Sequence, residues 1–348
     1  MEIWSVKAAI SILDCTLRDG SYAVNQQFTS DDTARICLAL EECGVRQIEI
    51  GHGVGLGASG ERFGVAAATD EQYIEAAASV LKHASFGAFF IPGIGTDQHL
   101  KYARQHGMKF IRIGTNVAEY HNARHSIEYA RELGFEVSYN PMKSYLATPT
   151  ELLAIVRNAV AWGAQAAYVV DSAGSLLPSE VREYVAVLTN DLDIPIGFHG
   201  HNNLLLAIAN CLAAYEGGGT LFDGTLQGLG RSGGNAQTEI LAYIFSKKNV
   251  STGLDVMRLL EAGEKLIRPL MKGQETGSSS LNVVIGMGGF HSSYLPRIQK
   301  AAERFDVDLK HLILEVCQHD RVDPSQALID RVAADLAQQK KAKNVAVG

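Results

Sequence analysis

The chain has 348 residues, of which 47% are hydrophobic and 20% are charged, and its formal net charge is −7 at pH 7. This composition allows a large buried core and excludes an intrinsically disordered chain. The acidic balance, with no basic block outside the tail at Lys340–Lys343, argues against a nucleic-acid partner. No stretch reaches the roughly 18–20 apolar residues of a membrane span, and no signal peptide is recognisable. We therefore expect a cytoplasmic protein without a membrane partner.

Eight short apolar runs, rich in β-branched residues, recur at intervals of about 25–35 residues, which is typical of strand–helix–strand units. The predicted strands are Ser11–Leu17, Arg46–Gly51, Ser85–Pro92, Phe110–Thr115, Glu136–Met142, Ala167–Asp171, Ile194–His199 and Phe222–Leu226. Capped amphipathic helices are predicted between them, at Asp31–Cys43, Thr69–His83, Asn122–Leu133, Thr148–Trp162, Pro178–Thr189 and Asn203–Glu216. The pattern predicts an α/β fold, a (β/α)8 TIM barrel, over residues 1–250. A doubly wound open sheet remains the alternative, because alternation alone does not show closure.

Residues 251–348 have a different pattern, with helical stretches and no further strand. The predicted helices are Leu254–Ile267, Tyr294–Phe305 and Pro324–Gln338, and the stretches Gly273–Ser280 and Gly286–Gly289 are predicted to form a joint. We expect a helical C-terminal appendage packed against the barrel.

Polar residues gather where the predicted strands end, and in a TIM barrel these ends face the active site. His199 and His201 form a His-x-His pair, whose imidazoles point to one side of a strand because alternate residues share a face. With Asp19 across the barrel, the pair predicts a site of two histidines and one carboxylate with open positions. Such a site suits Mn2+, Mg2+, Co2+ or Fe2+ better than structural zinc.

Arg18 precedes Asp19, and a guanidinium beside a metal can hold an α-keto acid and stabilise the enolate formed when a neighbouring bond breaks. Glu49, near the end of the second predicted strand, is a candidate to orient Arg18. The alternatives are an Arg–Asp pair in a surface loop and a buried Glu49 without a chemical role.

These motifs as a set resemble the metal-dependent family that includes hydroxymethylglutaryl-CoA lyase, isopropylmalate synthase and, most similar, 4-hydroxy-2-oxovalerate aldolase. The resemblance covers nearly the whole chain. It rests on DCTLRDGSYA (Asp14–Ala23), IEIGHGVGLGASG (Ile48–Gly60), FHGHNNL (Phe198–Leu204), GRSGGNAQTEI (Gly230–Ile240) and GGFHSSYL (Gly288–Leu295), among others.

The resemblance implies an aldolase that cleaves a 4-hydroxy-2-keto acid to pyruvate and an aldehyde. It implies metal ligands at Asp19, His199 and His201, with Mn2+ expected first, and it places His199 and Arg18 at the substrate. Asn235 matches a position that completes the metal shell in lyase and synthase relatives, and Ser172 matches a contact of the substrate carboxylate. The C-terminal helices resemble a communication region that docks an acylating aldehyde dehydrogenase, and we also expect a homo-oligomer.

Three positions depart from the family pattern. Tyr22 stands where the aldolases carry their catalytic histidine, and His291 stands where they carry a tyrosine, so the two residue types have exchanged places. Histidine suits the base better, because its unperturbed pKa is about 6.5 against about 10 for tyrosine. Phe89 replaces the usual leucine in the pocket wall, so we expect a substrate other than the family's standard one. The alternative is that the base is lost and His291 is incidental.

Two other functions stay open. One is a Claisen-type acyl-CoA synthase or lyase, although no basic rim for CoA is recognisable. The other is a non-catalytic barrel that only serves a dehydrogenase as a partner, which the presence of Asp19, His199 and His201 argues against.

Overall fold

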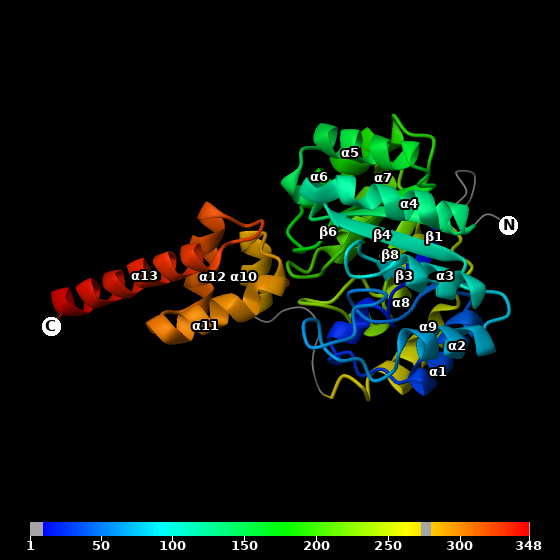
Figure 1. Ribbon diagram of the computed structural model, residues 1–348, viewed down its shortest axis with the longest axis horizontal. Helices are drawn as coiled ribbons and strands as arrows, with labels where there is room; N and C mark the ends of the chain where they lie inside the picture. Colours follow the sequence, from blue (N-terminus) through cyan, green and yellow to red (C-terminus); the bar gives the residue numbers. More distant parts are fainter. Residues whose placement is uncertain (1–9, 273–279, 348) are drawn as a thin grey trace.

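Eight parallel strands form a closed barrel in the computed structural model, which describes residues 10–272 and 280–347 (Figure 1). The strands are β1 (Ser11–Asp14), β2 (Gln47–Glu49), β3 (Ser85–Phe90), β4 (Phe110–Asn116), β5 (Glu136–Met142), β6 (Ala166–Asp171), β7 (Ile196–Gly200) and β8 (Leu221–Gly224). Because β1 pairs with both β2 and β8, no strand of the barrel is left at an edge. The predicted TIM barrel is confirmed, and the open sheet is wrong.

Helices surround the barrel and connect its strands. They are α1 (Ser30–Glu42), α2 (Asp70–Val80), α3 (Asp97–Gln105), α4 (Ala123–Glu132), α5 (Pro149–Ala161), α6 (Pro178–Thr189), α7 (Ala207–Glu216) and α8 (Thr238–Lys247). Thr29, Thr69 and Thr148 begin α1, α2 and α5 with reciprocal capping boxes, which satisfy backbone N–H groups that have no partner inside the helix. The helices α3 and α8 are additional to those predicted.

The barrel interior changes from apolar to charged along its length. Toward the amino ends of the strands, the interior is filled by a separate cluster of buried side chains. Its members include Leu13, Phe110, Ala166, Tyr168 and Leu221. Arg112 on β4 stands above this cluster, its guanidinium 4.4 Å from the ring centroid of Tyr168. A charged residue at this depth needs buried partners of opposite charge, and these lie toward the mouth of the barrel.

The helix α9 (Val256–Ala262) and the π-helical turn at Gly263–Ile267 pack on the barrel, and Leu259, Ile267 and Met271 belong to its main core. The sequence places the boundary between the two parts at residue 250. Because these buried side chains follow that point, we propose a division after Met271 instead.

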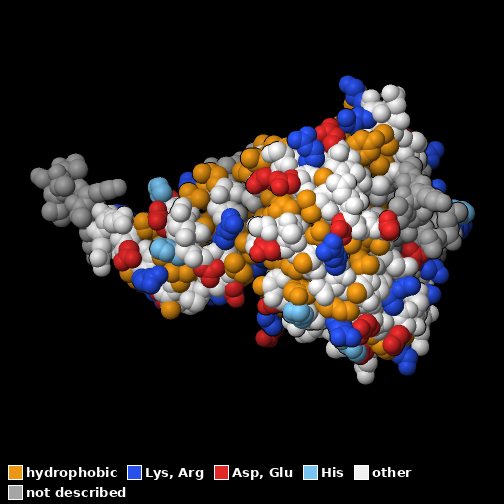
Figure 2. Space-filling view, turned by 90° about the horizontal axis from the view of Figure 1, so that it is seen from above, with side chains coloured by type: hydrophobic (Ala, Val, Ile, Leu, Met, Phe, Trp, Pro, Cys, Tyr) orange, Lys and Arg blue, Asp and Glu red, His pale blue; other side chains and the backbone are white. Residues whose placement is uncertain are grey.

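Four further helices form a lobe with its own core beside the barrel (Figure 1). They are α10 (Ser280–Gly288), α11 (Leu295–Phe305), α12 (Leu309–His319) and α13 (Gln326–Val347). The predicted joint at Gly286–Gly289 is wrong, because most of it forms the end of α10. Of the other predicted joint, Gly273–Ser280, residues 273–279 lie outside the described residues. Figure 2 shows the lobe as a narrow projection whose visible face mixes hydrophobic and charged side chains. Within the described ranges, no helix is long and apolar enough to cross a membrane.

Candidate active site

Six buried side chains at the mouth of the barrel form a closed ring of ion pairs and hydrogen bonds. In order, the ring runs through Asp19, Arg18, Glu49, Arg112, Asp223 and His199. Arg18 donates from Nη1 to Oδ2 of Asp19 at 2.5 Å and from Nε to Oε2 of Glu49 at 2.8 Å. Arg112 donates from Nη1 to the same Oε2 of Glu49 at 3.0 Å. Glu49 therefore holds Arg18 and Arg112 side by side.

The other half of the ring joins Arg112 to His199. Arg112 donates from Nη2 to Oδ2 of Asp223 at 2.6 Å, and Nδ1 of His199 lies 2.8 Å from that same oxygen. Nε2 of His199 lies 3.8 Å from Oδ2 of Asp19, which closes the ring. Because Asp223 engages Nδ1 of His199, the Nε2 lone pair is directed toward Asp19, as in many histidine ligands of metals.

The ring carries a surplus of negative charge. Two guanidinium groups face three carboxylates, so the ring has one carboxylate more than it has guanidinium groups. Burial alone would raise the pKa of Asp19, but the charge of Arg18 and the hydrogen bond from the backbone N–H of Arg231 hold it well below its usual range. Asp19 is thus an ionised carboxylate that no solvent screens, which favours a bound cation.

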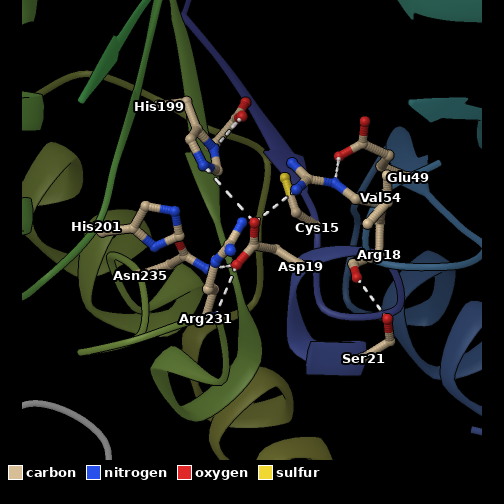
Figure 3. Close-up of polar contacts among 12 residues, drawn as sticks. Cys15, Arg18, Asp19, Ser21, Glu49, Val54, His199, His201, Arg231 and Asn235 are labelled. Atoms are coloured by element: carbon tan, nitrogen blue, oxygen red, sulfur yellow. Dashed lines mark hydrogen bonds and ion pairs between the residues drawn. The ribbon is translucent and has the colours of Figure 1, made fainter. Parts of the chain in front are cut away.

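Asp19, His199 and His201 together form a candidate metal centre, because their ligand atoms lie within 4.8 Å of one another (Figure 3). Burial lowers the pKa of His201 to about 4, so its imidazole is neutral and can act as a ligand. Asn235 donates from Nδ2 to Oδ1 of Asp19 at 2.9 Å. Its buried Oδ1 has no hydrogen-bond partner within the described part of the chain, so it is free to contribute a fourth donor atom.

A second group with metal-ligand geometry consists of Cys15, His199 and Asp223. Burial raises the pKa of the Cys15 thiol well above its ordinary value, so the sulfur keeps its proton. Oδ2 of Asp223 is already shared by Arg112 and His199. Since a metal requires the thiolate, the Asp19 group is the better centre.

Two of the predicted substrate contacts, Phe89 and Ser172, lie in different parts of the site. Phe89 on β3 lies beside Arg18, whose guanidinium carbon is 5.0 Å from the ring centroid. Ser172 lies at the end of β6, and its hydroxyl accepts a hydrogen bond from the backbone N–H of Lys143 at 3.0 Å. Phe89 therefore belongs to the surroundings of Arg18, whereas Ser172 contacts the loop after β5.

Tyr22 and His291 meet through a third residue, Arg231. The guanidinium carbon of Arg231 lies 4.7 Å from the ring centroid of Tyr22, and its Nη1 is 3.4 Å from Nε2 of His291. The backbone N–H of Ser293 also donates to Nδ1 of His291 at 3.3 Å, so each ring nitrogen of His291 faces an N–H donor. The exchanged pair thus faces one guanidinium, with His291 contributed by the lobe and Tyr22 by the short helix after β1.

Comparisons with known proteins agree with this geometry. Residues 9–266 match the HMGL-like family model, and residues 277–338 match the DmpG-like communication domain. The chain is 37% identical to the 4-hydroxy-2-oxovalerate aldolase of Carboxydothermus hydrogenoformans, over 95% of this chain and 98% of that protein. It is 39% identical to the enzyme of the same name from Pelotomaculum thermopropionicum, over 95% and 97% of the two chains. The chain belongs to the 4-hydroxy-2-oxovalerate aldolase family. It is therefore an enzyme, a carbon–carbon lyase, and the resemblance found in the sequence is confirmed.

Solved structures share the fold of this family member at lower identity. The carboxyl transferase domain of Rhizobium etli pyruvate carboxylase aligns with a TM-score of 0.77 at 15% identity, covering 96% of this chain and 61% of that one. The N-terminal domain of a putative aldolase from Bacteroides vulgatus aligns with a TM-score of 0.69 at 24% identity, covering 82% and 94%.

Three residues of this family member's site were missed in the sequence. Arg112 and Asp223 stand inside apolar runs, FIRIG (Phe110–Gly114) and LFDG (Leu221–Gly224), where a charge is unusual. A charged residue in a buried strand requires a partner, so this signal was available. Arg231 was recognised only as part of a glycine-rich motif, and nothing in the motif indicated its contact with His291.

Proposed function

We propose that this enzyme cleaves a 4-hydroxy-2-keto acid to pyruvate and an aldehyde, or catalyses the reverse condensation, with a divalent cation such as Mn2+. The observation that carries the proposal is the position of Asp19, His199 and His201 directly beside the buried guanidinium of Arg18. The names of the relatives, 4-hydroxy-2-oxovalerate aldolase, support the same reaction class.

The donor set fits a hard or borderline divalent cation. Two imidazole nitrogens, one carboxylate oxygen and the free amide oxygen of Asn235 leave positions open for a substrate. When bound, the cation supplies Lewis-acid polarisation of the keto oxygen of the substrate.

Arg18 provides the positive charge that stabilises the enolate of pyruvate. Its Nε and Nη1 are occupied by Glu49 and Asp19, whereas its Nη2 has no hydrogen-bond partner among the described residues. We propose that Nη2 binds the keto acid, in an orientation fixed by the two carboxylates. Phe89 covers one side of the guanidinium and limits its contact with water.

His291 is proposed as the base, with Tyr22 orienting the substrate hydroxyl. Nε2 of His291 takes the proton of the C4 hydroxyl, the C3–C4 bond breaks, and C4 becomes the aldehyde carbon. The electron pair of that bond passes to C3 and the carbonyl as the enolate. Protonation at C3 then gives pyruvate and balances the proton removed from the hydroxyl.

A pyruvate-release assay tests this proposal. The metal-depleted enzyme is incubated with racemic 4-hydroxy-2-oxovalerate and related adducts, with and without Mn2+, and pyruvate is measured with lactate dehydrogenase and NADH. We expect pyruvate and an equal amount of aldehyde only when the cation is present. Consumption of acetyl-CoA with 2-keto acids, without cleavage of any adduct, would instead support the Claisen-type alternative.

The lobe of α10–α13 is proposed to dock an acylating aldehyde dehydrogenase that consumes the aldehyde, and the matched communication domain supports this. Met287 on α10 is 63% exposed and is a candidate contact. Light scattering of the enzyme, alone and with such a dehydrogenase, measures both the expected homo-oligomer and the complex. We expect Met287→Glu to weaken the complex without affecting pyruvate release.

A further inference from the structure

Arg231, at the mouth of the barrel, is a cation without an ion-pair partner among the residues that the structure describes. Its Nε donates to Oγ of Ser292 at 2.8 Å, its Nη1 faces Nε2 of His291, and its guanidinium covers the ring of Tyr22. No described carboxylate forms an ion pair with it, and no described residue accepts a hydrogen bond from its Nη2. Arg18 and Arg112, by contrast, each pair with two carboxylates.

A second cation, Lys143, lies close by and also has no ion-pair partner among the described residues. Lys143 follows β5 with a left-handed backbone (φ 60°), is 3% exposed, and donates from Nζ to Oη of Tyr294 and to the carbonyl oxygen of Val322. None of the described carboxylates forms an ion pair with Lys143. Burial, together with the charges of Arg231 and Lys143, lowers the pKa of His291 well below its ordinary value. This part of the site is therefore electropositive.

Buried or half-buried charges without ion-pair partners are unfavourable in the free protein and are retained where a ligand supplies the opposite charge. We infer that Arg231 binds an acidic group on the aldehyde half of the substrate. The preferred substrate is then a 4-hydroxy-2-keto acid with a second anionic group, a carboxylate or a phosphate, and the aldehyde released is itself an anion. This inference rests on the proposed function, since it extends the same site.

The geometry sets where the acidic group belongs on the substrate. The keto-acid end is held at Arg18, and the C4 hydroxyl faces Tyr22 and His291. Because Arg231 touches both of these rings, a group attached at C5 or beyond reaches its guanidinium. The planar fork of arginine suits a carboxylate or a phosphate equally well.

A purely structural role for Arg231 makes a different prediction. Its bond to Ser292 links the barrel to the lobe, so a structural arginine would affect all substrates alike. A residue that recognises the acidic group changes the ratio of kcat/KM between acidic and neutral substrates.

The experiment compares pyruvate adducts in the presence of Mn2+. Neutral adducts are made from acetaldehyde and unbranched alkanals, carboxylate adducts from glyoxylate and succinic semialdehyde, and the phosphate adduct from glycolaldehyde phosphate. We expect the wild-type enzyme to prefer one acidic adduct over the neutral adduct of equal length by about tenfold or more, about 1.4 kcal/mol. The better of the carboxylate and phosphate adducts identifies the acidic group.

Three variants test the role of Arg231 itself. Arg231→Gln should abolish this preference by lowering kcat/KM for the acidic adduct more than for the neutral one, and Arg231→Lys should retain part of it. Arg258→Gln is the matched control, because Arg258 on α9 is 65% exposed and contacts the backbone oxygen of Glu42, at the end of α1 away from the mouth. The control should keep the wild-type preference.

The outcomes separate this inference from the proposed function. Pyruvate release without a preference for any acidic adduct in the wild-type enzyme would overturn the inference and leave the aldolase in place. An equal loss on acidic and neutral adducts in Arg231→Gln would also overturn it, and would assign Arg231 to the link with the lobe. If no adduct yields pyruvate, the proposed function fails and the inference fails with it.

Discussion

One guanidinium, that of Arg112, reaches the carboxylate of Asp223 through Nη2 at 2.6 Å in the interior of the barrel. Its Nη1 reaches Glu49 at 3.0 Å, so Arg112 spans the two carboxylates that hold Arg18 and His199. Arg112 therefore fixes both Arg18, which we propose binds the substrate, and His199, which we propose binds the metal. Arg112 is a positioning residue, because it contacts the side chains that orient the reacting groups and not the reacting groups themselves.

Replacing Arg112 with methionine keeps the volume of the side chain and removes its charge. Glu49 and Asp223 would then be buried carboxylates with one partner fewer, so we expect a loss of about 3–5 kcal/mol in the free energy of unfolding. We also expect Mn2+ affinity to fall about tenfold or more, because Asp223 would no longer fix His199. Denaturant unfolding and equilibrium Mn2+ binding measure the two effects.

Tyr168→Phe is the matched control for Arg112. The ring beneath the guanidinium is kept, and the hydroxyl that is lost is buried without a described hydrogen-bond partner. This variant should leave both quantities close to the wild type. Unchanged Mn2+ affinity in a folded Arg112→Met enzyme would limit Arg112 to a structural role.

His199→Ala should separate the metal site from the fold. We expect Mn2+ to bind at least about 100-fold more weakly and pyruvate release to be lost, because a ligand is removed and not merely reoriented. The thermal midpoint should change little, since the apolar barrel core does not contain His199. His125→Ala, an exposed histidine on α4, is the control. Wild-type Mn2+ affinity in His199→Ala would exclude the proposed centre.

The eight strand–helix units and the meeting of Asp19, His199 and His201 could be predicted from the sequence, whereas the closure of the barrel could not. Eight alternations of strand and helix are compatible with few chain topologies. In every TIM barrel the carboxyl ends of the strands converge at the mouth. The lobe was harder to predict, because the glycines at Gly286 and Gly288 favour a joint by local rules, yet they lie within α10. The division that we propose after Met271 rests on tertiary packing, which alone shows that Leu259 and Ile267 belong to the barrel core.

The charges of Arg112 and Asp223 within apolar strands were visible in the sequence, but their pairing with each other was not. The two residues are 111 positions apart on β4 and β8, strands that are not neighbours in the barrel. Their meeting depends on the tilt and width of the closed sheet, which no periodicity encodes. The same limit applies to Arg231, whose contact with His291 depends on how the lobe lies against the barrel.

The exchanged pair of Tyr22 and His291 is tested by restoring the order that the family resemblance implies. We expect Tyr22→His combined with His291→Tyr to release pyruvate at least about fivefold faster than His291→Tyr alone. Tyr22→Phe should cost less than His291→Ala, because orienting a hydroxyl contributes less than removing its proton. Steady-state kcat measures these effects. A double variant no faster than the single one would remove Tyr22 and His291 as a catalytic pair.

The pH dependence of kcat/KM should reflect the charges around His291. Burial and the charges of Arg231 and Lys143 lower the pKa of His291, and Asp19 only partly opposes them. A base must be unprotonated, so activity is present above this pKa and is lost as the pH falls through it. We therefore expect an acidic limb with a midpoint well below pH 6.5.

Arg231→Gln should move that limb to higher pH, because one of the charges that lowers the pKa of His291 is removed. A second change in kcat/KM is expected near pH 8. There the ammonium of Lys143 loses its proton, because burial lowers its pKa to about 8. A wild-type midpoint at pH 6.5 or higher, or a limb that does not move in Arg231→Gln, would show that His291 is not the titrating base.

The central claim is that Arg18 and the adjacent metal centre stabilise the enolate of pyruvate. Exchange of the methyl protons of pyruvate for deuterium in D2O measures enolate formation directly, whatever the aldehyde, and mass spectrometry follows it. We predict exchange that requires Mn2+ and falls by about 10²-fold or more in Arg18→Lys, which keeps the charge but loses the planar fork. Exchange at the rate of the buffer in the Mn2+-loaded wild-type enzyme, or an undiminished rate in Arg18→Lys, would contradict the claim.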